Sequence, residues 1–440
     1  MEKNASPCRL ESDGDLVELI NSKTRHEASE RTISRQRAAA ALLALLLLLL
    51  GASTLLLARP GVEPAASPDE GPDAPPVLVC YYSTPDATAA LQPEAIPAGL
   101  CTHINVAFAR VRGKRLHLEP PQRAALRHVV RLKQADPGLK VLLSVGGGGG
   151  DAGFSEMVAD HASRKVFIKS IKSFLRNYTL DGIDLDWEFP AVHDYDYNVR
   201  RGRERQHFSQ LLREIRAEYQ REKRDYLLTV AVAAPEIIID AAYDVDQLNL
   251  YADFVNVMTY DYHMYSRLTP FTGFNAPLFA ERGERLYLAT LNANYTVHAY
   301  LSRGLARARL VLGVPAYGHS FRLVSAAAAG PGAPASGVGA LGARGFVDYA
   351  DACRLARAPG AVRARDAAAA VPYLHRGAEW LSYDDERSVV RKAAYARAEG
   401  LRGVMVYSLN ADDFRGACAP GARFPLVSAV RRALSVRPVT

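Results

Sequence analysis

The segment Asp181-Gly182-Ile183-Asp184-Leu185-Asp186-Trp187-Glu188-Phe189-Pro190 alternates acidic and apolar side chains. Side chains in a β-strand repeat every two residues, so Asp184, Asp186 and Glu188 would share one face of a strand. Carboxylates stacked on a buried face repel one another and resist desolvation. A protein keeps such a row when its chemistry requires an acid that stays protonated near neutral pH.

Two other interpretations explain this acidic row less well. A solvent-exposed edge strand would account for the alternation but not for the large apolar neighbours Trp187 and Phe189. A calcium-binding loop also places oxygen ligands at alternate positions, but it needs glycine at its sixth position, where this chain has Phe189. The row therefore indicates a catalytic site.

Short apolar segments and helical patterns alternate on both sides of the row. The expected strands are 77–83, 103–109, 140–146, 182–188, 227–233, 254–260, 310–316 and 403–408. Helical periodicity falls between most of them, at 121–134, 164–177, 204–223, 284–303 and 385–399. Eight strand-then-helix units predict an α/β fold, the (β/α)8 TIM barrel, with an open doubly wound sheet as the alternative. Functional side chains of such a barrel lie at the carboxyl ends of its strands, where Asp186 and Glu188 stand.

The connection between the seventh and eighth strands is too long for a simple loop and helix. It runs from about 318 to 381 and includes an Ala-, Gly- and Pro-rich stretch at 325–345. We expect a small α+β insertion that walls one side of the cleft. A mostly disordered loop is the alternative.

A long apolar run lies near the N-terminus. Residues 38–58 are uncharged, and as a helix they would span about 31 Å, the thickness of a bilayer's hydrocarbon core. A cleaved signal peptide is the alternative, but its apolar core is shorter and closer to the N-terminus. Basic residues precede the run and acidic residues follow it, which predicts a type II orientation.

The expected organisation is therefore a single-pass type II membrane protein. A cytoplasmic tail (1–37) would be followed by a transmembrane signal anchor (38–58), a Pro-rich stalk (59–76) and a catalytic domain (77–440). That domain would lie outside the cell or in a lumen, at the plasma membrane or the Golgi.

Cysteines and glycosylation sequons agree with this topology. The cysteines beyond the apolar run form an even set, Cys80, Cys101, Cys353 and Cys418. An even set on the oxidising side indicates two disulfides, in any of three pairings. Asn177 and Asn294 each begin a sequon on the same side.

The overall charge argues against one class of partner. The chain has 440 residues and a formal net charge of +7, from 54 basic and 47 acidic residues. We find no dense basic run with interleaved aromatic residues, so the pattern does not predict binding to nucleic acid. The excess is typical of a dispersed, Arg-rich surface.

Six segments, in order over about residues 77–434, resemble motifs of the family 18 glycoside hydrolases, the chitinases and chitinase-like proteins. Besides the acidic row they are Ser144-Val145-Gly146-Gly147, Met258-Thr259-Tyr260-Asp261, Gly313-Val314-Pro315-Ala316-Tyr317-Gly318, Glu379-Trp380-Leu381-Ser382-Tyr383-Asp384-Asp385 and Gly403-Val404-Met405-Val406-Tyr407. The resemblance implies a TIM barrel that acts on chitin or chito-oligosaccharides, polymers of β-1,4-linked N-acetylglucosamine.

The resemblance also implies a substrate-assisted, retaining mechanism. Glu188 would protonate the glycosidic oxygen while the substrate's own acetamido oxygen attacks the anomeric carbon. Asp186 would hold the acetamido N–H, with Asp184 behind it as a coupled partner. Tyr260 would hydrogen-bond the acetamido oxygen. No cofactor or metal is implied, because the acid, the internal nucleophile and water complete the chemistry.

Further positions follow from the same resemblance. The expected substrate-binding residues are Tyr81, Phe108, Gly147, Met258, Asp261, Tyr317, His319 and Tyr407. The implied disulfides are Cys80–Cys101 and Cys353–Cys418. We expect a monomer.

The chain departs from the family pattern at several aromatic positions. Family members usually have Trp where this chain has Gly148 and Tyr407, and Arg where it has His319. Sugar rings stack on such aromatic platforms, so we expect weak attack on crystalline chitin. A catalytically silent chitinase-like lectin is the second hypothesis. Such lectins typically lose the final acid of the row, so the presence of Glu188 favours an enzyme.

Overall fold

The computed structural model describes residues 75–84, 91–192, 203–419 and 421–436. All of them belong to one compact unit, Ser67–Thr440. The expected tail, the apolar run 38–58 and nearly all of the stalk lie outside the described residues. Within those described ranges, no helix combines the length and the apolar character that a membrane crossing requires.

Eight parallel strands close into a barrel, because β1 pairs with β2 on one side and with β15 on the other. The strands are β1 (Val77–Ser83), β2 (His103–Arg112), β4 (Lys140–Gly146), β5 (Gly182–Asp186), β6 (Leu227–Val232), β7 (Phe254–Val257), β8 (Leu310–Pro315) and β15 (Gly403–Tyr407). The predicted (β/α)8 barrel is confirmed. The open doubly wound sheet is wrong, since it would leave its edge strands unpaired.

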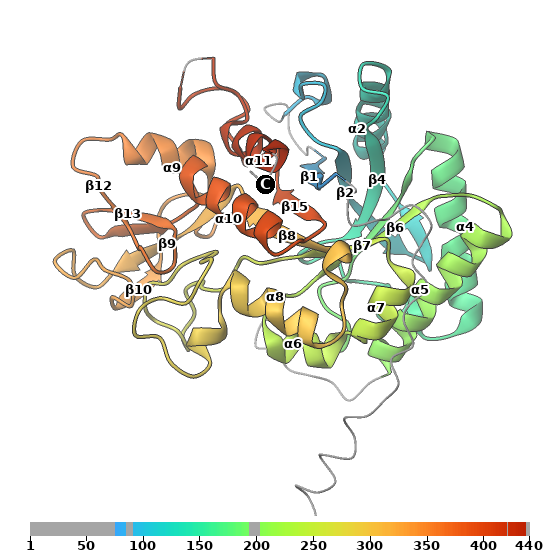
Figure 1. Ribbon diagram of the computed structural model, residues 1–440, viewed down its shortest axis with the longest axis horizontal. Helices are drawn as coiled ribbons and strands as arrows, with labels where there is room; N and C mark the ends of the chain where they lie inside the picture. Colours follow the sequence, from blue (N-terminus) through green and yellow to red (C-terminus); the bar gives the residue numbers. More distant parts are fainter. Residues whose placement is uncertain (1–74, 85–90, 193–202, 420, 437–440) are drawn as a thin grey trace, which may run out of the picture. The chain divides into compact units, whose positions relative to one another are not determined.

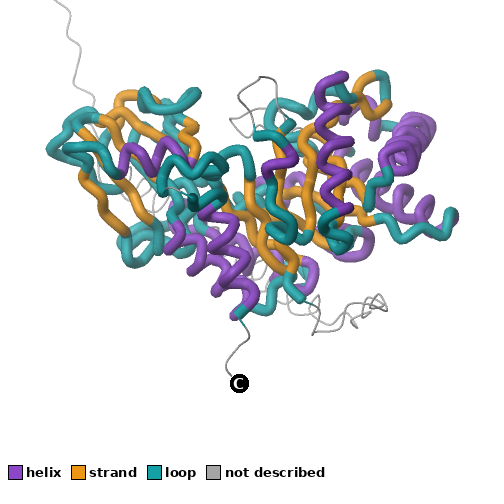
Figure 2. The backbone as a smooth tube through the Cα atoms, turned by 90° about the horizontal axis from the view of Figure 1, so that it is seen from above, coloured by secondary structure: helices purple, strands orange, loops and turns teal. Residues whose placement is uncertain are grey.

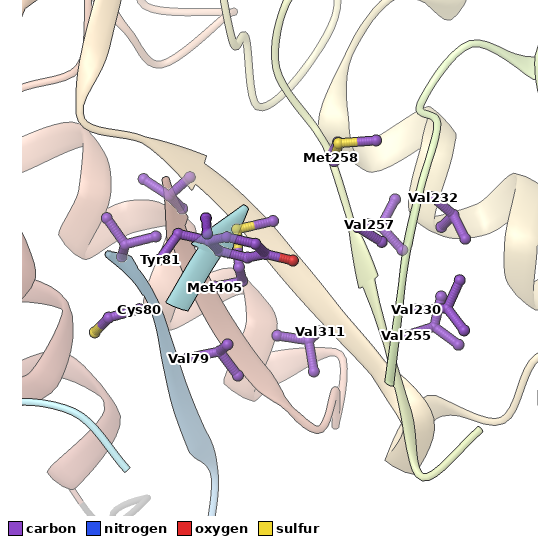
Figure 3. Close-up of a cluster of buried hydrophobic side chains, with 14 of the residues drawn as sticks. Val79, Cys80, Tyr81, Val230, Val232, Val255, Val257, Met258, Val311 and Met405 are labelled. Carbon is purple, nitrogen blue, oxygen red and sulfur yellow. The ribbon is translucent and has the colours of Figure 1, made fainter. Parts of the chain in front are cut away.

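The register of the strands decides which side chains share the barrel interior. Ser144 on β4, Asp184 on β5 and Thr229 on β6 are direct neighbours in the ladder, so their side chains point the same way. Apolar side chains fill much of the remaining core, among them Val79 from β1 and Met405 from β15 (Figure 3). The acidic row therefore stands in the barrel interior, with polar neighbours on the adjacent strands and apolar side chains around them.

Helices cover the outside of the barrel (Figure 1). They are α2 (Pro120–Arg131), α3 (Phe154–Val158), α4 (His161–Tyr178), α5 (Glu204–Arg221), α6 (Glu236–Ala242), α7 (Val245–Tyr251), α8 (Ala293–Ser302), α10 (Glu386–Ala398) and α11 (Pro425–Ser435). Helix α5 shows the pattern that forms them. Its buried residues Phe208, Leu211, Leu212, Ile215 and Tyr219 recur every three or four positions and make one apolar stripe.

The helix prediction is wrong at the start of one helix. The helix expected at 284–303 begins only at Ala293, because the Asn292 side chain accepts a hydrogen bond from the Tyr295 amide and caps the helix there. Before the cap the chain forms a single 3-10 turn, η3 (Leu288–Thr290). Two short helices, α6 and α7, separate β6 from β7.

Between β8 and β15 the chain forms a second, antiparallel sheet. Its strands are β9 (Tyr317–Leu323), β10 (Ala335–Val338), β11 (Phe346–Asp348), β12 (Val362–Arg365), β13 (Pro372–Arg376) and β14 (Glu379–Ser382), with helix α9 (Tyr349–Ala356). Figure 2 shows these strands as a group beside the barrel. The sheet has a core of its own around Trp380, Phe321 and Phe274.

Remaining short elements complete the connections. Strand β3 (Arg115–His117) pairs antiparallel with β2, and 3-10 turns stand at η1 (Pro93–Ala95), η2 (Leu132–Gln134) and η4 (Arg307–Arg309). Two disulfides join Cys80 to Cys101 and Cys353 to Cys418. These are the pairs that the resemblance implied. The second disulfide ties α9 of the inserted sheet to the segment that follows β15.

Candidate active site

The acidic row divides at the end of β5. Asp184 and Asp186 lie within the strand and are buried, whereas Glu188 lies just beyond the strand end and is partly exposed. The expected strand 182–188 is therefore too long, because its ladder to β4 ends at Asp186. The last acid is consequently held by the loop after β5, at the mouth of the barrel.

Four strands hold Asp184 in place. Its Oδ2 accepts hydrogen bonds from the hydroxyls of Tyr81 and Ser144, both at 2.7 Å. Its Oδ1 accepts from the Thr229 hydroxyl at 2.5 Å and from the Asn256 amide at 3.2 Å. Burial raises the pKa of Asp184, and these four donors oppose that rise by stabilising the charged form.

Asp186 has a contrasting environment. Its Oδ1 is buried and finds no hydrogen-bond partner among the described residues. Burial, followed by the charges of Glu188 and Asp184, holds the pKa of Asp186 well above its usual range. An unpaired buried oxygen is costly unless a ligand or a proton satisfies it, so Asp186 is poised to bond a polar group that enters the site.

Glu188 is the acid of the row that lines a pocket of about 190 Å³. The pocket is lined by Gly148, Gly149, Asp151, Glu188, Phe189, Val192, Ala233, Ala234, Pro235, Ile238, Met258, Tyr260, Asp261 and Met264. Burial first, and then the charges of Asp261 and Asp151, raise the pKa of Glu188 to about 7. Glu188 can therefore carry a proton near neutral pH and release it to a bound group.

Asp261 is fixed on the opposite side of this pocket. Its Oδ1 accepts from the Tyr317 hydroxyl and from His319 Nε2, each at 2.7 Å. Its backbone amide donates to Asn275 Oδ1 at 3.0 Å, which holds Asp261 in a left-handed conformation with φ of 59°. Tyr260, its neighbour, is buried with its hydroxyl 3.8 Å from Met405 Sδ.

Aromatic rings line the barrel mouth around the acids. The ring centroids of Tyr81 and Tyr407 are 5.5 Å apart, and those of Phe108 and Tyr407 are 6.3 Å apart and stacked. The ring centroid of Tyr260 lies 6.3 Å from that of Tyr407 and 6.0 Å from that of Tyr317. Phe108 and Tyr407 are the partly exposed members, so their faces are the ones that a sugar could reach.

Two of the residues expected to contact substrate are buried. Tyr81 is 1% exposed and its hydroxyl is bound to Asp184, so it positions that acid and presents no free ring face. Gly147 is buried under Phe108, whose ring would lie 2.4 Å from a β-carbon at this position. Met258, in contrast, lines the pocket beside Glu188.

Sequence reasoning missed the residues that position the acids. Thr229 and Asn256 bond Asp184, and Asn275 bonds Asp261, but none belongs to a motif that we singled out. A polar residue within an apolar strand was the available signal for Thr229 and Asn256. The first acid, Asp181, has a structural role: its Oδ2 accepts from Lys133 Nζ at 2.7 Å and from the Val141 amide at 2.8 Å.

The two sequon asparagines differ in their surroundings. Asn177 is exposed at the end of α4. Asn294 is half-buried at the start of α8, and its Oδ1 accepts a hydrogen bond from the Tyr395 hydroxyl at 3.0 Å. The side chain of Asn177 is therefore the more accessible of the two.

Comparison with known proteins places this arrangement in context. The family model described as "Glycosyl hydrolases family 18" matches residues 77–412. Chitotriosidase-1 from Mus musculus is 36% identical over 374 residues, which cover 82% of this chain and 78% of that protein.

Two solved structures are similar over all of their own length. The Group IV chitinase of Ostrinia furnacalis superposes with a TM-score of 0.76 at 33% identity, covering 82% of this chain and 100% of that one. Human YKL-39, described as a pseudo-chitinase with retained chitooligosaccharide binding properties, gives the same TM-score of 0.76 and the same coverage at 33% identity. The similar proteins thus include a chitinase and a pseudo-chitinase.

Proposed function

The chain belongs to glycosyl hydrolase family 18, and from this premise we propose that it hydrolyses β-1,4-linked N-acetylglucosamine in chitin or chito-oligosaccharides with retention of configuration. One observation carries the proposal. Glu188 faces the pocket with a pKa raised to about 7, so its carboxyl group holds a proton near neutral pH. Cleavage of a glycosidic bond needs a general acid of this kind.

In the proposed first step, Glu188 donates its proton to the glycosidic oxygen. The carbonyl oxygen of the substrate's acetamido group attacks the anomeric carbon, and the bond to the leaving sugar breaks. The leaving sugar departs with the proton of Glu188, and a cyclic cation remains on the retained sugar. This substrate-assisted route needs no protein nucleophile, which fits a site whose inner acids are fixed deep in the barrel.

Asp186 and Tyr260 support the cyclic cation. The unpaired Oδ1 of Asp186 is free to accept the acetamido N–H. The Tyr260 hydroxyl, which donates to Met405 Sδ at 3.8 Å, would exchange this long bond for one to the acetamido oxygen. Asp184 stands behind Asp186 as its partner in the acidic row, and its charge adds to burial and to the charge of Glu188 in raising the pKa of Asp186. Negative charge shared by this pair stabilises the cation that forms above it.

The second step restores the enzyme. Glu188, now a carboxylate, takes a proton from a water molecule, whose oxygen attacks the anomeric carbon. The cyclic bond opens, the acetamido group is regenerated, and Glu188 is protonated again. Two displacements at the same carbon retain the configuration.

A glycan-binding protein without turnover is the second candidate. One similar protein, human YKL-39, is described as a pseudo-chitinase that keeps chitooligosaccharide binding. The complete set of acids in this chain favours hydrolysis over binding alone, because a lectin has no use for a protonated Glu188 at the pocket.

A fluorogenic chito-oligosaccharide series tests the proposal. We expect the wild-type chain to release the fluorophore and Glu188→Gln to lose at least about a hundredfold in kcat, since general acid catalysis supplies that much. Glu188→Gln should still bind chitotetraose, measured by calorimetry. If the wild type binds chitotetraose but releases no fluorophore, the lectin is favoured. If the wild type and Glu188→Gln release the fluorophore equally, Glu188 is not the general acid.

We also propose that the protein is anchored in a membrane by its N-terminal apolar run. The apolar run 38–58 would anchor the chain, with residues 1–37 in the cytoplasm and the barrel outside or in a lumen. Expression in mammalian cells tests this through glycosidase-sensitive mass shifts. Asn177→Gln should remove one glycan. Asn4-Ala5-Ser6 also matches the sequon, but Asn4→Gln should change nothing, because Asn4 would lie in the cytoplasm. Release of the barrel into the medium without the run 38–58 would instead indicate a cleaved signal peptide.

A further inference from the structure

A second hollow lies on the outside of the barrel, and its lining comes mainly from β3, α4 and α5. Figure 1 shows α4 and α5 as neighbours. The hollow has a volume of about 1020 Å³ and shares no residue with the pocket at Glu188. Its lining holds six basic residues, Arg115, Lys165, Lys169, Lys172, Arg176 and Arg221. Only Glu214 and Glu218 oppose them there. We call this hollow the basic groove.

Four of these cations form a stripe along α4. Lys165, Lys169, Lys172 and Arg176 follow one another at steps of four, three and four residues, which places their side chains on one helix face. With the rise of an α-helix, the stripe is about 16 Å long. The groove therefore presents charge along a line, not at one point.

Part of this charge is neutralised between the helices. Lys172 pairs with both Glu218 and Glu222, and Arg176 pairs with Glu222 at 2.6 Å. Arg221 pairs with Glu218 within α5 at 2.5 Å. These pairs join α4 to α5, so this half of the groove has a structural purpose.

The other half of the groove keeps its charge. Arg115, Lys165 and Lys169 are exposed, and no ion pair involves them within the ranges that the structure describes. Glu214, the remaining carboxylate of the lining, is occupied by Arg164, which bonds it at 3.1 and 2.7 Å. Three like charges that face one hollow repel each other, and the carboxylates of the lining are already paired with other cations, which indicates an anionic ligand.

We propose that the basic groove binds a linear sulfated polysaccharide. Sulfate groups stay charged across the physiological pH range and repeat along the polymer, which matches a line of cations. Leu116, Ile168 and Phe174 form an apolar part of the lining between the cations. A flat bilayer surface does not follow a concave trough, and nucleic acid would favour exposed aromatic rings for its bases, whereas Phe174 is half-buried.

Titration of the full-length chain with a heparin-derived oligosaccharide tests this proposal. The groove variant is Arg115→Ser/Lys165→Ser/Lys169→Ser. The control variant, Arg322→Ser/Arg387→Ser/Arg391→Ser, removes the same charge from exposed positions on β9 and α10. We expect about a tenfold loss of affinity or more in the groove variant and a shallower dependence on salt, because fewer counterions are released. The control should stay close to the wild type.

Three outcomes would overturn the proposal. The wild type could fail to bind the oligosaccharide at physiological salt. Both variants could lose affinity equally, which would mean a general charge effect. Tighter binding to anionic vesicles or to single-stranded DNA, with no competition by heparin, would assign the groove to another class of ligand. Circular dichroism of each variant establishes that it is folded, and chito-oligosaccharide turnover is a separate readout that neither triple variant should change.

Discussion

Asp184 and Asp186 stand two positions apart on one strand but differ in their bonding. Asp184 accepts four hydrogen bonds, whereas one oxygen of Asp186 has none among the described residues. Glu188, the next acid in the row, meets the pocket directly. In the proposed mechanism, three carboxyl groups would thus serve as anchor, as partner for a ligand and as proton donor, because the surroundings of each differ.

The pKa of Glu188 sets the alkaline limit of activity. Only the protonated form can donate, so kcat/KM should fall as the pH rises through about 7. The negative charge of Asp261 contributes to this raised pKa, and its removal therefore lowers the pKa. Asp261→Asn should move the alkaline limb of the pH–rate profile to lower pH, besides any loss of rate. An unshifted limb would show that Asp261 does not act on Glu188.

The two donors to Asp261 should act together. Tyr317→Phe and His319→Gln each remove one hydrogen bond to the same oxygen, and each should reduce kcat/KM by about tenfold, the effect of losing a bond to a charged group. The fold loss of kcat/KM in the double variant should be smaller than the product of the two single losses, because both hydrogen bonds hold the same carboxylate. Full additivity in this double-mutant cycle would indicate that the two residues act separately.

The strands could be predicted from the sequence, because each is a short apolar run bounded by turn residues. The acids of the site were found for the same reason: they alternate within one strand. Thr229 and Asn256 could not be assigned to the site, since only the register of β5, β6 and β7 brings them to Asp184. Helix boundaries are harder to predict from the sequence, because a single capping residue, such as Asn292 at the start of α8, decides where a helix begins.

The end of β4 depends on a glycine. A β-carbon on Gly146, which has φ of 114°, would lie 1.9 Å from the Asp186 carbonyl oxygen. Gly146→Ala should therefore lose about 2 kcal/mol or more in unfolding free energy and lower kcat, since the backbone of Asp186 must move. Gly149→Ala is the matched control, because Gly149 also has positive φ but has no atom within 4 Å of its would-be β-carbon. Gly149→Ala should lose only about 1–2 kcal/mol of unfolding free energy. Equal losses in the two variants would show that the positive φ, and not the contact with Asp186, causes the strain.

At the scale of the whole molecule, the inserted sheet is fastened to the barrel by a disulfide. Cys353 and Cys418 are 65 residues apart in sequence, and Cys80 and Cys101 are 21 apart. Closing the longer loop restricts the unfolded chain more. Cys353→Ser/Cys418→Ser should therefore lower the free energy of unfolding by about 4 kcal/mol, and Cys80→Ser/Cys101→Ser should lower it by about 3 kcal/mol. Urea unfolding of the two double variants measures this, and a larger loss from the shorter loop would contradict the loop-entropy explanation.

The hydrogen bonds of Asp184 also bear on the time at which the protein becomes active. Their donors stand on β1, β4, β6 and β7, from Tyr81 to Asn256, and β1 is held in place by β15 near the end of the chain. A nascent chain would therefore complete the support of this cradle only once β15 had emerged from the ribosome. We expect a chain that ends before β15 to lack chito-oligosaccharide turnover, because nothing then closes the barrel beside β1.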